Sequence, residues 1–481
     1  MASPLLLLLL MLMILCMSHP SCQMVLLPLT HSLSKAQFNS THHLLKSTST
    51  RSAARFRHHR QLSLPLSPGS DYTLSFNLGP QAQAQPITLY MDTGSDLVWF
   101  PCAPFKCILC EGKPSLSLSS PTNISQSIAV SCKSSACSAA HNSIPSSDLC
   151  AMARCPLESI ETSDCASFSC PPFYYAYGDG SLIARLYRDT LSLSSLFLKN
   201  FTFGCAHTTL AEPIGVAGFG RGLLSFPAQL ATQAPQLGNR FSYCLVSHSF
   251  DSERVRRPSP LILGRYDDKE KKDGDGGEMV EFAYTPMLEN PKHPYFYCVG
   301  LDGISVGKRT IPAPEMLRRV NRRGDGGVVV DSGTTFTMLP AGFYDSVVAE
   351  FDGRVGRENE RARRVEEKTG LAPCYYLNAM VKVPAVTLRF AGGNSSVVLP
   401  RKNFFYEFLD GGDGTRRKRR VGCLMLMNGG DEAELSGGPG ATLGNYQQQG
   451  FEVVYDLEEK RVGFARRQCA SLWDKLNRDK N

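Results

Sequence analysis

Two stretches of the chain decide its fold: Leu89-Tyr-Met-Asp92-Thr93-Gly94-Ser95 and Val328-Val-Val-Asp331-Ser332-Gly333-Thr334. Each is an apolar run, typical of a β-strand, that ends in an aspartate followed by a hydroxyl residue, a glycine and a second hydroxyl residue. A single copy of this pattern is ordinary turn chemistry. Two copies, separated by about one domain length, predict two similar lobes that each contribute one aspartate to a shared site.

Each copy is followed later in the chain by a shorter element of two residues and a glycine, Val216-Ala-Gly218 and Thr442-Leu-Gly444. Duplication suits a reaction in which two carboxylates meet across a pseudo-twofold axis. Carboxylates about 3 Å apart cannot both ionise readily, so they share a proton, and one serves as base while the other serves as acid. The pattern therefore predicts Asp92 and Asp331 as a catalytic pair, with Gly94 and Gly333 allowing close backbone approach.

The rest of the chain reads as mainly β. Alternating apolar residues over 72–78 and 87–91 predict a hairpin that leads directly into Asp92. Helical periodicity is scarce, and the best candidate covers 341–367, with Phe343, Val347, Val348 and Phe351 on one face.

The first 70 residues differ in character from the remainder of the chain. Residues 1–22 carry a leucine-rich run followed by small polar residues, which predicts a signal peptide. No Lys or Arg precedes the run, as one does in a typical signal peptide, and the alternative is a membrane anchor. Residues 23–70 are polar without a sustained period, which predicts a propeptide rather than a folded unit. The polar C-terminus, 471–481, does not carry the hydrophobic tail of a lipid-anchor signal. We expect a secreted protein of the extracellular space or cell wall, or a vacuolar one, without a stable membrane anchor.

The basic character of the propeptide predicts that it inhibits its own enzyme by placing a Lys or Arg against the two aspartates. Acidification would weaken this contact, because carboxylates become protonated and clustered histidines become charged below about pH 6.5. His58 and His59, beside Arg55, Arg57 and Arg60, are the residues expected to contribute most. The alternative is a disordered basic leader without an inhibitory role.

The net charge of +7 does not indicate nucleic-acid binding. Residues 1–70 hold six Lys and Arg residues and no Asp or Glu, so the remainder of the chain is nearly neutral. The basic run Arg416-Arg-Lys-Arg-Arg420 lies in a Gly- and Asp-rich stretch and predicts a solvated loop in a secreted protein. We expect a monomer that acts on polypeptides and binds no nucleic acid.

Further landmarks accompany the two aspartates in a fixed order: Asp92-Thr-Gly-Ser-Asp-Leu-Val-Trp99, Tyr177-Gly-Asp-Gly-Ser181, Phe203-Gly-Cys205, Phe219-Gly-Arg-Gly222, Phe241-Ser-Tyr-Cys244, Asp331-Ser-Gly-Thr-Thr335 and Gly444-Asn-Tyr-Gln-Gln-Gln449. In these landmarks the chain resembles the pepsin family, and within it the plant nepenthesin-like aspartic proteases. The resemblance implies a mainly β, bilobal fold with the active-site cleft between two pseudo-twofold-related lobes. It assigns 71–245 to an N-terminal lobe with a cysteine-rich insertion and 246–470 to a C-terminal lobe.

The same resemblance implies roles for particular residues. Tyr177 would be the flap tyrosine over the substrate, with Gly178 and Asp179 at the flap tip, and Trp99 would support the flap by accepting a hydrogen bond from Tyr177 or through water. Thr93 and Ser332 would form hydrogen bonds between the lobes, and Ser95 and Thr334 would hold the outer carboxylate oxygens.

The cysteines indicate disulfides, since a secreted chain with 17 of them is oxidised. Family resemblance suggests pairs Cys244 with Cys469, Cys374 with Cys423, and Cys205 with one of Cys102, Cys107 or Cys110. Cys298 is then left over; its apolar neighbours predict a buried thiol, against the alternative of a disulfide to a second chain. Glycosylation sequons occur at Asn39, Asn123, Asn200 and Asn394.

No cofactor or metal is expected. The glycine run 215–222 does not have the spacing of a dinucleotide loop, Cys107-Ile-Leu-Cys110 lacks a partner pair for zinc, and no serine-hydrolase elbow is present. The alternative function belongs to another class: a pepsin-fold protein, similar to plant xylanase inhibitors, that binds without cutting.

Overall fold

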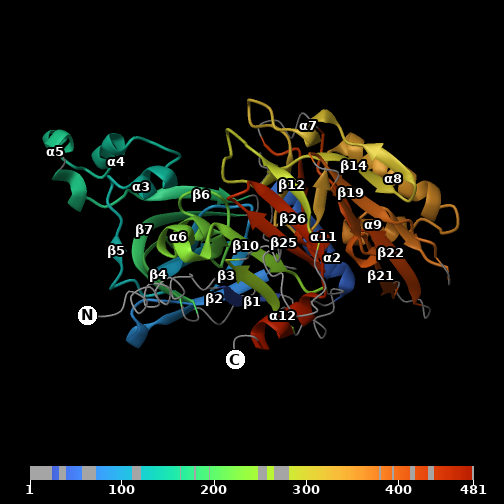
Figure 1. Cartoon of the computed structure of the whole chain (residues 1–481), viewed down its shortest axis with the longest axis horizontal. Coiled ribbons are helices and arrows are strands. Elements are labelled where there is room, and N and C mark those ends of the chain that lie inside the picture. Colours follow the sequence, from blue (N-terminus) through green and yellow to red (C-terminus); the bar gives the residue numbers. More distant parts are fainter. Residues whose placement is uncertain are drawn as a thin grey trace, which may run out of the picture.

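The computed structural model of the 481-residue chain describes residues 24–31, 40–56, 72–110, 121–162, 164–177, 180–193, 196–247, 257–264, 281–378, 381–392, 395–411, 418–431 and 438–478. Residues 1–22, where we expect a signal peptide, lie outside the described residues. Two strand-rich lobes lie side by side along the long axis of the molecule, with a sheet between them (Figure 1). This arrangement confirms the expected mainly β, bilobal fold.

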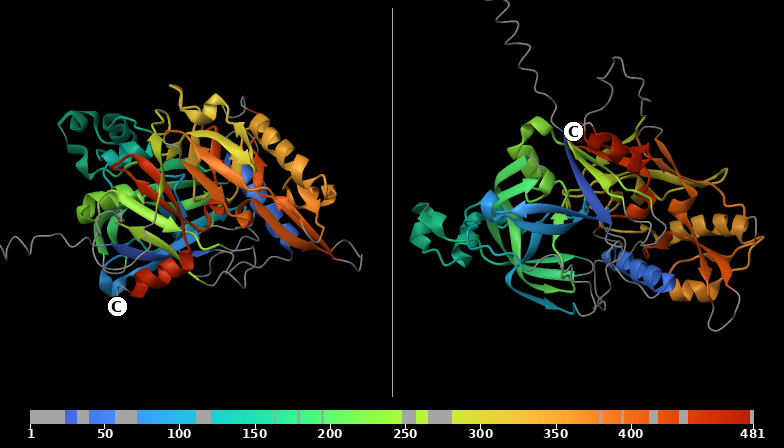
Figure 2. Two further views of the ribbon diagram at one scale, coloured as in Figure 1. Left: turned by 45° about the vertical axis from the view of Figure 1, so that its right-hand side comes forward. Right: turned by 90° about the horizontal axis from the view of Figure 1, so that it is seen from below.

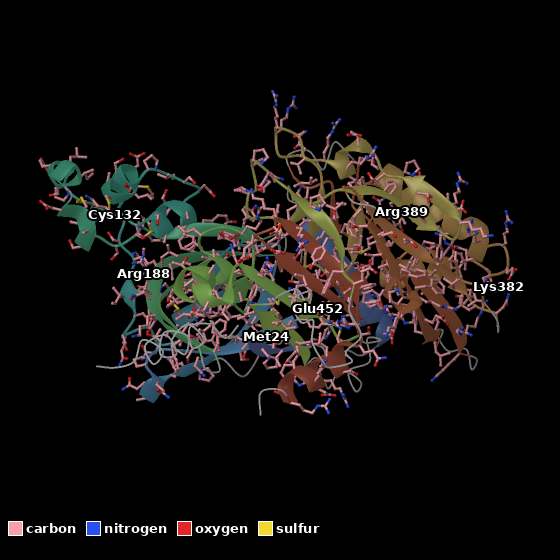
Figure 3. The ribbon with its side chains drawn as sticks, in the orientation of Figure 1. Met24, Cys132, Arg188, Lys382, Arg389 and Glu452 are labelled. Carbon is pink, nitrogen blue, oxygen red and sulfur yellow. A yellow bond between two sulfur atoms is a disulfide. The ribbon has the colours of Figure 1, made fainter. Side chains whose placement is uncertain are left out.

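An antiparallel sheet joins the two lobes. Its strands run in the order β1 (Val25–His31), β11 (Ser259–Leu263), β10 (Arg240–Cys244), β25 (Phe451–Asp456), β26 (Arg461–Arg466) and β12 (Ala283–Leu288). Glu452 of β25 is fully buried and accepts hydrogen bonds from Ser242 and Arg467, at 3.0 and 3.1 Å. Figure 3 shows Glu452 near the middle of the molecule, between Cys132 toward one end and Lys382 toward the other.

The N-terminal lobe is built on the predicted hairpin, which the structure confirms as antiparallel β2 (Tyr72–Leu78) and β3 (Gln85–Asp92). Strand β3 pairs in parallel with β9 (Val216–Gly218), β9 pairs antiparallel with β4 (Val98–Ile108), and β4 pairs in parallel with β8 (Leu196–Leu210). Strands β6 (Phe173–Tyr177), β7 (Gly180–Leu193) and β8 continue this sheet, and helix α6 (Phe226–Gln233) follows β9. Residues of β2 alternate between buried and exposed from Leu74 to Leu78 because side chains alternate along a strand, whereas β3 is buried on both faces from Leu89 to Asp92.

The C-terminal lobe repeats the same pairing pattern. Strand β16 (Val328–Val330) pairs in parallel with β24 (Ala441–Leu443), β24 pairs antiparallel with β17 (Thr337–Leu339), and β17 pairs in parallel with β23 (Leu426–Asn428). One of its outer sheets has the strand order β15 (Arg309–Pro312), β14 (Leu301–Val306), β19 (Val386–Phe390) and β20 (Ser396–Leu399). The other has the order β18 (Cys374–Tyr376), β22 (Arg419–Leu424) and β21 (Phe405–Asp410). Duplicated sequence thus gives duplicated topology around the two aspartates.

The helix expected over 341–367 is two helices, α8 (Ala341–Val355) and α9 (Arg363–Thr369). On α8, Phe343, Val347 and Phe351 are buried as the periodicity predicted. Between the helices, Asn359 is buried, with its side-chain amide donating to the Val355 carbonyl at 2.9 Å. That hydrogen bond satisfies a carbonyl that the end of α8 leaves without a helical partner. The polar C-terminal segment also contains a helix, α12 (Cys469–Arg478).

Parts of 23–70 are folded, which corrects the expectation that this stretch forms no folded unit. Strand β1 pairs with β11 from Val25 opposite Leu263 to Leu29 opposite Ser259. Helix α2 (Thr41–Phe56) packs Leu44 and Leu45 against Phe336 and Met338 of the C-terminal lobe. Figure 2, in its right-hand view, shows α2 beside the orange helices of that lobe. The apolar positions of α2 are few, and the burial of both segments depends on partners far along the chain.

The cysteine-rich insertion of the N-terminal lobe extends from the body at one end of the molecule (Figure 1). It carries the short helices α3 (Ser135–Ala140), α4 (Ser146–Met152) and α5 (Leu157–Thr162). Its disulfides are Cys132–Cys150, Cys137–Cys170 and Cys155–Cys165. Because the helices are short, these cross-links supply order that a small apolar core would not provide.

Candidate active site

Asp92 ends β3 and Asp331 directly follows β16, so the two aspartates occupy equivalent places in the two lobes. Both are buried, with 1% and 6% of their surface exposed. The two turns are in close contact: a Cβ atom on Gly94 would lie 2.8 Å from Cγ of Asp331. Only glycine fits here, because real Cβ atoms do not approach a carboxylate so closely.

Thr93 and Ser332 join the lobes beneath the aspartates. The Thr93 amide donates to Ser332 Oγ at 3.0 Å, and the Ser332 amide donates to Thr93 Oγ1 at 2.9 Å. Each hydroxyl then donates across to the opposite lobe, Thr93 to the Val330 carbonyl at 2.9 Å and Ser332 to the Met91 carbonyl at 3.1 Å. These reciprocal hydrogen bonds fix the separation of the two turns.

The outer carboxylate oxygens are held differently in the two lobes. Thr334 Oγ1 donates to Asp331 Oδ2 at 2.6 Å, as the resemblance implies. Ser95 is buried, but within the described part of the chain its hydroxyl has no hydrogen-bond partner, which corrects the role given to it. Backbone amides hold the inner oxygens, from Gly94 to Asp92 at 2.9 Å and from Gly333 to Asp331 at 2.7 Å.

Side chains that sequence reasoning did not assign support the pair from below. Gln448 donates to the carbonyls of Asp331 and Leu443, at 3.2 and 2.8 Å, and accepts a hydrogen bond from the Tyr243 hydroxyl. The Tyr455 hydroxyl lies 2.8 Å from that of Tyr243 and donates to the Val330 carbonyl at 3.3 Å. Burial raises the pKa of Tyr243 well above its usual value, so it stays a neutral donor. In the sequence, the motifs that contain Tyr243 and Gln448 indicated that these regions matter, but not which contacts the two side chains make.

Tyr177 ends β6 and is half-buried beside Trp99. The Trp99 indole Nε1 donates to the Tyr177 hydroxyl at 2.6 Å. This direction corrects the expectation that Trp99 accepts the hydrogen bond, since an indole N–H is a donor only. Gly178 and Asp179, expected at the flap tip, lie outside the described residues.

The structure pairs Cys244 with Cys469, Cys374 with Cys423, and Cys205 with Cys102, while Cys107 pairs with Cys110. Cys298 is free and buried. Of the sequons, Asn123 and Asn200 are exposed, whereas Asn39 and Asn394 lie outside the described residues.

Within the described part of the chain, one group of three potential metal ligands comes together: Cys137, His141 and Cys170. Cys137 and Cys170 form a disulfide, so neither offers a thiolate, and the group does not fit a metal ion. Among the helices of the described residues, none has the length and apolar character needed to cross a bilayer.

Comparison with known proteins places this geometry in a family. Residues 72–265 match the family model described as xylanase inhibitor N-terminal, and residues 296–466 match xylanase inhibitor C-terminal. A probable aspartyl protease of Arabidopsis thaliana is 67% identical over 473 residues, 94% of each chain. Aspartic proteinase nepenthesin-1 of Nepenthes gracilis is 27% identical over 410 residues, 83% of this chain and 78% of that protein.

Among solved structures, basic 7S globulin from soybean shares the fold, with a TM-score of 0.59 and 18% identity over 94% of this chain and 99% of that one. That likeness concerns the fold alone. Sequence identity to the Arabidopsis protein carries the assignment further: the chain belongs to the plant pepsin-like aspartyl proteases, a family of peptide hydrolases.

Proposed function

We propose that the protein is a secreted endopeptidase that cleaves polypeptides at acid pH, with a water molecule activated by Asp92 and Asp331. The observation that supports this most directly is the contact between the two turns. Thr93 and Ser332 bind each other across the lobes, and Gly94 lies against the Asp331 carboxylate. Such rigid placement is what general acid–base catalysis by two carboxylates requires.

In the proposed reaction, the ionised member of the pair takes a proton from water as the water attacks the peptide carbonyl carbon. The protonated member donates its proton to the carbonyl oxygen. Acid pH favours this state because two close carboxylates retain one proton between them. Thr334 and the amides of Gly94 and Gly333 orient the carboxylates so that these roles stay separate.

The test is hydrolysis of denatured haemoglobin at acid pH by the matured protein, with and without pepstatin. Asp92→Asn and Asp331→Asn should each lower kcat by about 1000-fold, since each removes one partner of the acid–base pair. A matched control, Asp345→Asn, changes an exposed aspartate of α8 and should retain wild-type turnover. Robust cleavage by either active-site variant would refute the assignment.

The competing proposal is a pepsin-fold protein that binds another protein without cutting it. The descriptions of the matching family models, xylanase inhibitor N-terminal and C-terminal, favour testing it. Retention of both aspartates and both bridging hydroxyls supports catalysis instead. An inactive matured wild type, with unfolding curves equal to those of the variants, would favour the binding protein.

We also propose that residues 23–70 are an inhibitory propeptide, that residues 1–22 direct secretion, and that the mature enzyme is a monomer of the cell wall or vacuole. Helix α2 supports the inhibitory role by its position. Ser52 Oγ accepts a hydrogen bond from the amide of Phe336 at 3.2 Å, and the Arg51 guanidinium lies 5.6 Å from the ring centre of Tyr90. These contacts are close in sequence to Asp331 and Asp92 respectively, so α2 touches both lobes near the active site.

A further inference from the structure

The two catalytic repeats differ at their fifth position, where the first has Asp96 and the second has Thr335. The structure places these residues equivalently. A Cβ on Gly218 would lie 2.5 Å from the carbonyl carbon of Asp96, and a Cβ on Gly444 would lie 2.4 Å from the carbonyl oxygen of Thr335. The N-terminal lobe therefore carries a third carboxyl group, close to the catalytic pair, where the C-terminal lobe carries a hydroxyl.

The Asp96 carboxylate binds the loop that follows β9. It accepts a hydrogen bond from the amide of Gly222 at 2.6 Å. The amide of Leu224 also favours the charged form of this carboxylate. A Cβ on Gly222 would lie 2.1 Å from Asp96 Oδ2, and one on Gly220 would lie 3.2 Å from Oδ1. The loop can approach the carboxylate this closely because both positions are glycine.

This loop also contacts the other lobe. The amide of Arg221 donates to the Tyr295 carbonyl at 3.0 Å, and the Tyr297 hydroxyl donates to the Gly220 carbonyl at 3.2 Å. The amide of Gly220 donates to the Ser95 carbonyl at 2.8 Å, within the catalytic turn. Asp96 thus holds one side of a loop whose other side is held by the C-terminal lobe.

The flap strand meets the same residue. The hydroxyl of Tyr175 in β6 lies close enough to Asp96 for both the charge and the backbone of Asp96 to influence its pKa, and the Tyr175 ring centre lies 5.0 Å from that of Tyr177. Asp96 therefore lies where the catalytic turn, the loop after β9 and the flap strand come together.

The surroundings of Asp96 disfavour its charge. Burial raises the pKa of Asp96 from 3.8 to about 6, although the amides of Gly222 and Leu224 act in the opposite direction. The titratable groups that face Asp96 are the hydroxyls of Tyr175, Tyr295 and Tyr297, and the charge of Asp92 acts on the first two of these hydroxyls as well. The nearby cation is Arg221, whose guanidinium hydrogen bonds Glu289 at 3.0 Å.

A raised acid pKa means that the folded state binds the proton more tightly than the unfolded state. The protonated Asp96 carboxyl group therefore stabilises the fold fully below pH 3.8, and this stabilisation is lost as the pH rises through about 6. Asp96 is thus neutral at acid pH and becomes a half-buried charge near neutrality.

We propose that Asp96 is a positioning residue, which ties the loop at 218–224 to the catalytic turn and thereby limits the active arrangement of the two lobes to acid pH. The proposal rests on the proposed acid endopeptidase function for its activity measurements, but not for its stability measurements.

The first test compares Asp96→Asn and Asp96→Ala with wild type. Asn keeps an acceptor for the Gly222 amide but cannot ionise, so its thermal midpoint should fall less between pH 5 and pH 7.5 than that of wild type. Its activity profile should extend by about half a pH unit or more toward neutrality. Ala loses the acceptor, so kcat/KM at acid pH should fall about tenfold, and Asn should recover part of that loss. Asp345→Asn is the control for removing a carboxylate.

The second test measures coupling with Gly222. Gly222→Ala places a Cβ against the Asp96 carboxylate, whose three terminal atoms are its nearest neighbours, at 2.1 to 2.7 Å. It should lower both the thermal midpoint and kcat/KM. Adding Asp96→Ala removes those atoms, so the double variant should be more stable than Gly222→Ala alone.

Thermal midpoints are measured across pH in the Asp331→Asn background as well, where no turnover is needed. If the proposed enzymatic function fails, these midpoints still decide the role of Asp96. Parallel midpoint curves and superimposed activity profiles for wild type and Asp96→Asn would overturn the proposal, as would strictly additive effects of Asp96→Ala and Gly222→Ala.

Discussion

At the scale of single residues, Cys298 shows how a thiol can be present and chemically silent. It lies in β13 (Cys298–Val299), opposite Val329 of β16, and is fully buried. Burial raises the pKa of Cys298 to about 12, so almost no thiolate exists at neutral pH. Reactivity of a cysteine requires the thiolate and access, and both are suppressed here.

We therefore predict that Cys298 in the native, non-reduced protein resists alkylation at pH 8 and is labelled only after unfolding. Peptide mapping of the matured protein measures this directly. Cys298→Ala is the control, because its unfolded form should lose that labelled peptide alone. Rapid native labelling, or a disulfide-linked dimer on a non-reducing gel, would contradict the prediction.

At the scale of elements, helix α2 is attached at several points to the C-terminal lobe. Ser49 Oγ donates to the Thr369 carbonyl at 2.8 Å, and His42 Nε2 lies 3.2 Å from Asp410 Oδ1. Arg51 is buried, whereas Lys46 is exposed. His58 and His59, the residues expected to contribute most to pH sensing, lie outside the described residues, as do the neighbouring Arg57 and Arg60.

We predict that Arg51→Ala in the full chain shifts the onset of proteolytic activity toward neutral pH, because it removes the buried cation that α2 places against Tyr90, two residues before Asp92 in β3. The measurement is activity against pH after timed acidification of the proform. Lys46→Ala removes an exposed cation of the same helix, more than one turn away and beside the Glu367 carbonyl, and should leave the onset unchanged. An unchanged onset for Arg51→Ala, together with the same onset for a chain that begins at residue 71, would rule out inhibition by this segment.

At the scale of the whole molecule, the disulfide Cys244–Cys469 links β10 of the joining sheet to the start of α12 across 225 residues of sequence. In the chain-entropy account, a cross-link stabilises by restricting the unfolded chain, and longer closed loops gain more. Cys374–Cys423 spans 49 residues within one lobe and Cys107–Cys110 spans only 3.

We predict that Cys244→Ser combined with Cys469→Ser lowers the free energy of unfolding by about 5 kcal/mol, against about 2 kcal/mol or less for Cys107→Ser combined with Cys110→Ser. Denaturant unfolding of the two double variants gives the comparison. Equal losses would show that the long cross-link acts through local packing rather than through the unfolded chain.

The sequence by itself determined the lobes, the hairpin into Asp92 and the pair of aspartates. These features are local: an alternating run makes a strand, and an aspartate, a hydroxyl and a glycine make the turn after it, whatever lies elsewhere. Repetition of the whole pattern then implied the second lobe. Ordered landmarks such as Gly444-Asn-Tyr-Gln also indicated the region that supports the pair, without assigning Gln448 its contacts.

Only the tertiary structure decided what depends on distant partners. Strand β1 is a strand because Leu263 and Ser259 lie opposite Val25 and Leu29, and α2 is docked because Phe336, 284 residues beyond Ser52, meets it. Ser95 matches the pattern of Thr334, yet it holds no carboxylate oxygen, since the two lobes are alike in backbone and different in side-chain surroundings. Asp96 acquires its raised pKa only when folding takes its carboxyl group out of water, against the opposing effect of the Gly222 amide. Burial and pairing across long stretches of chain are properties of the folded molecule, and no local pattern encodes them.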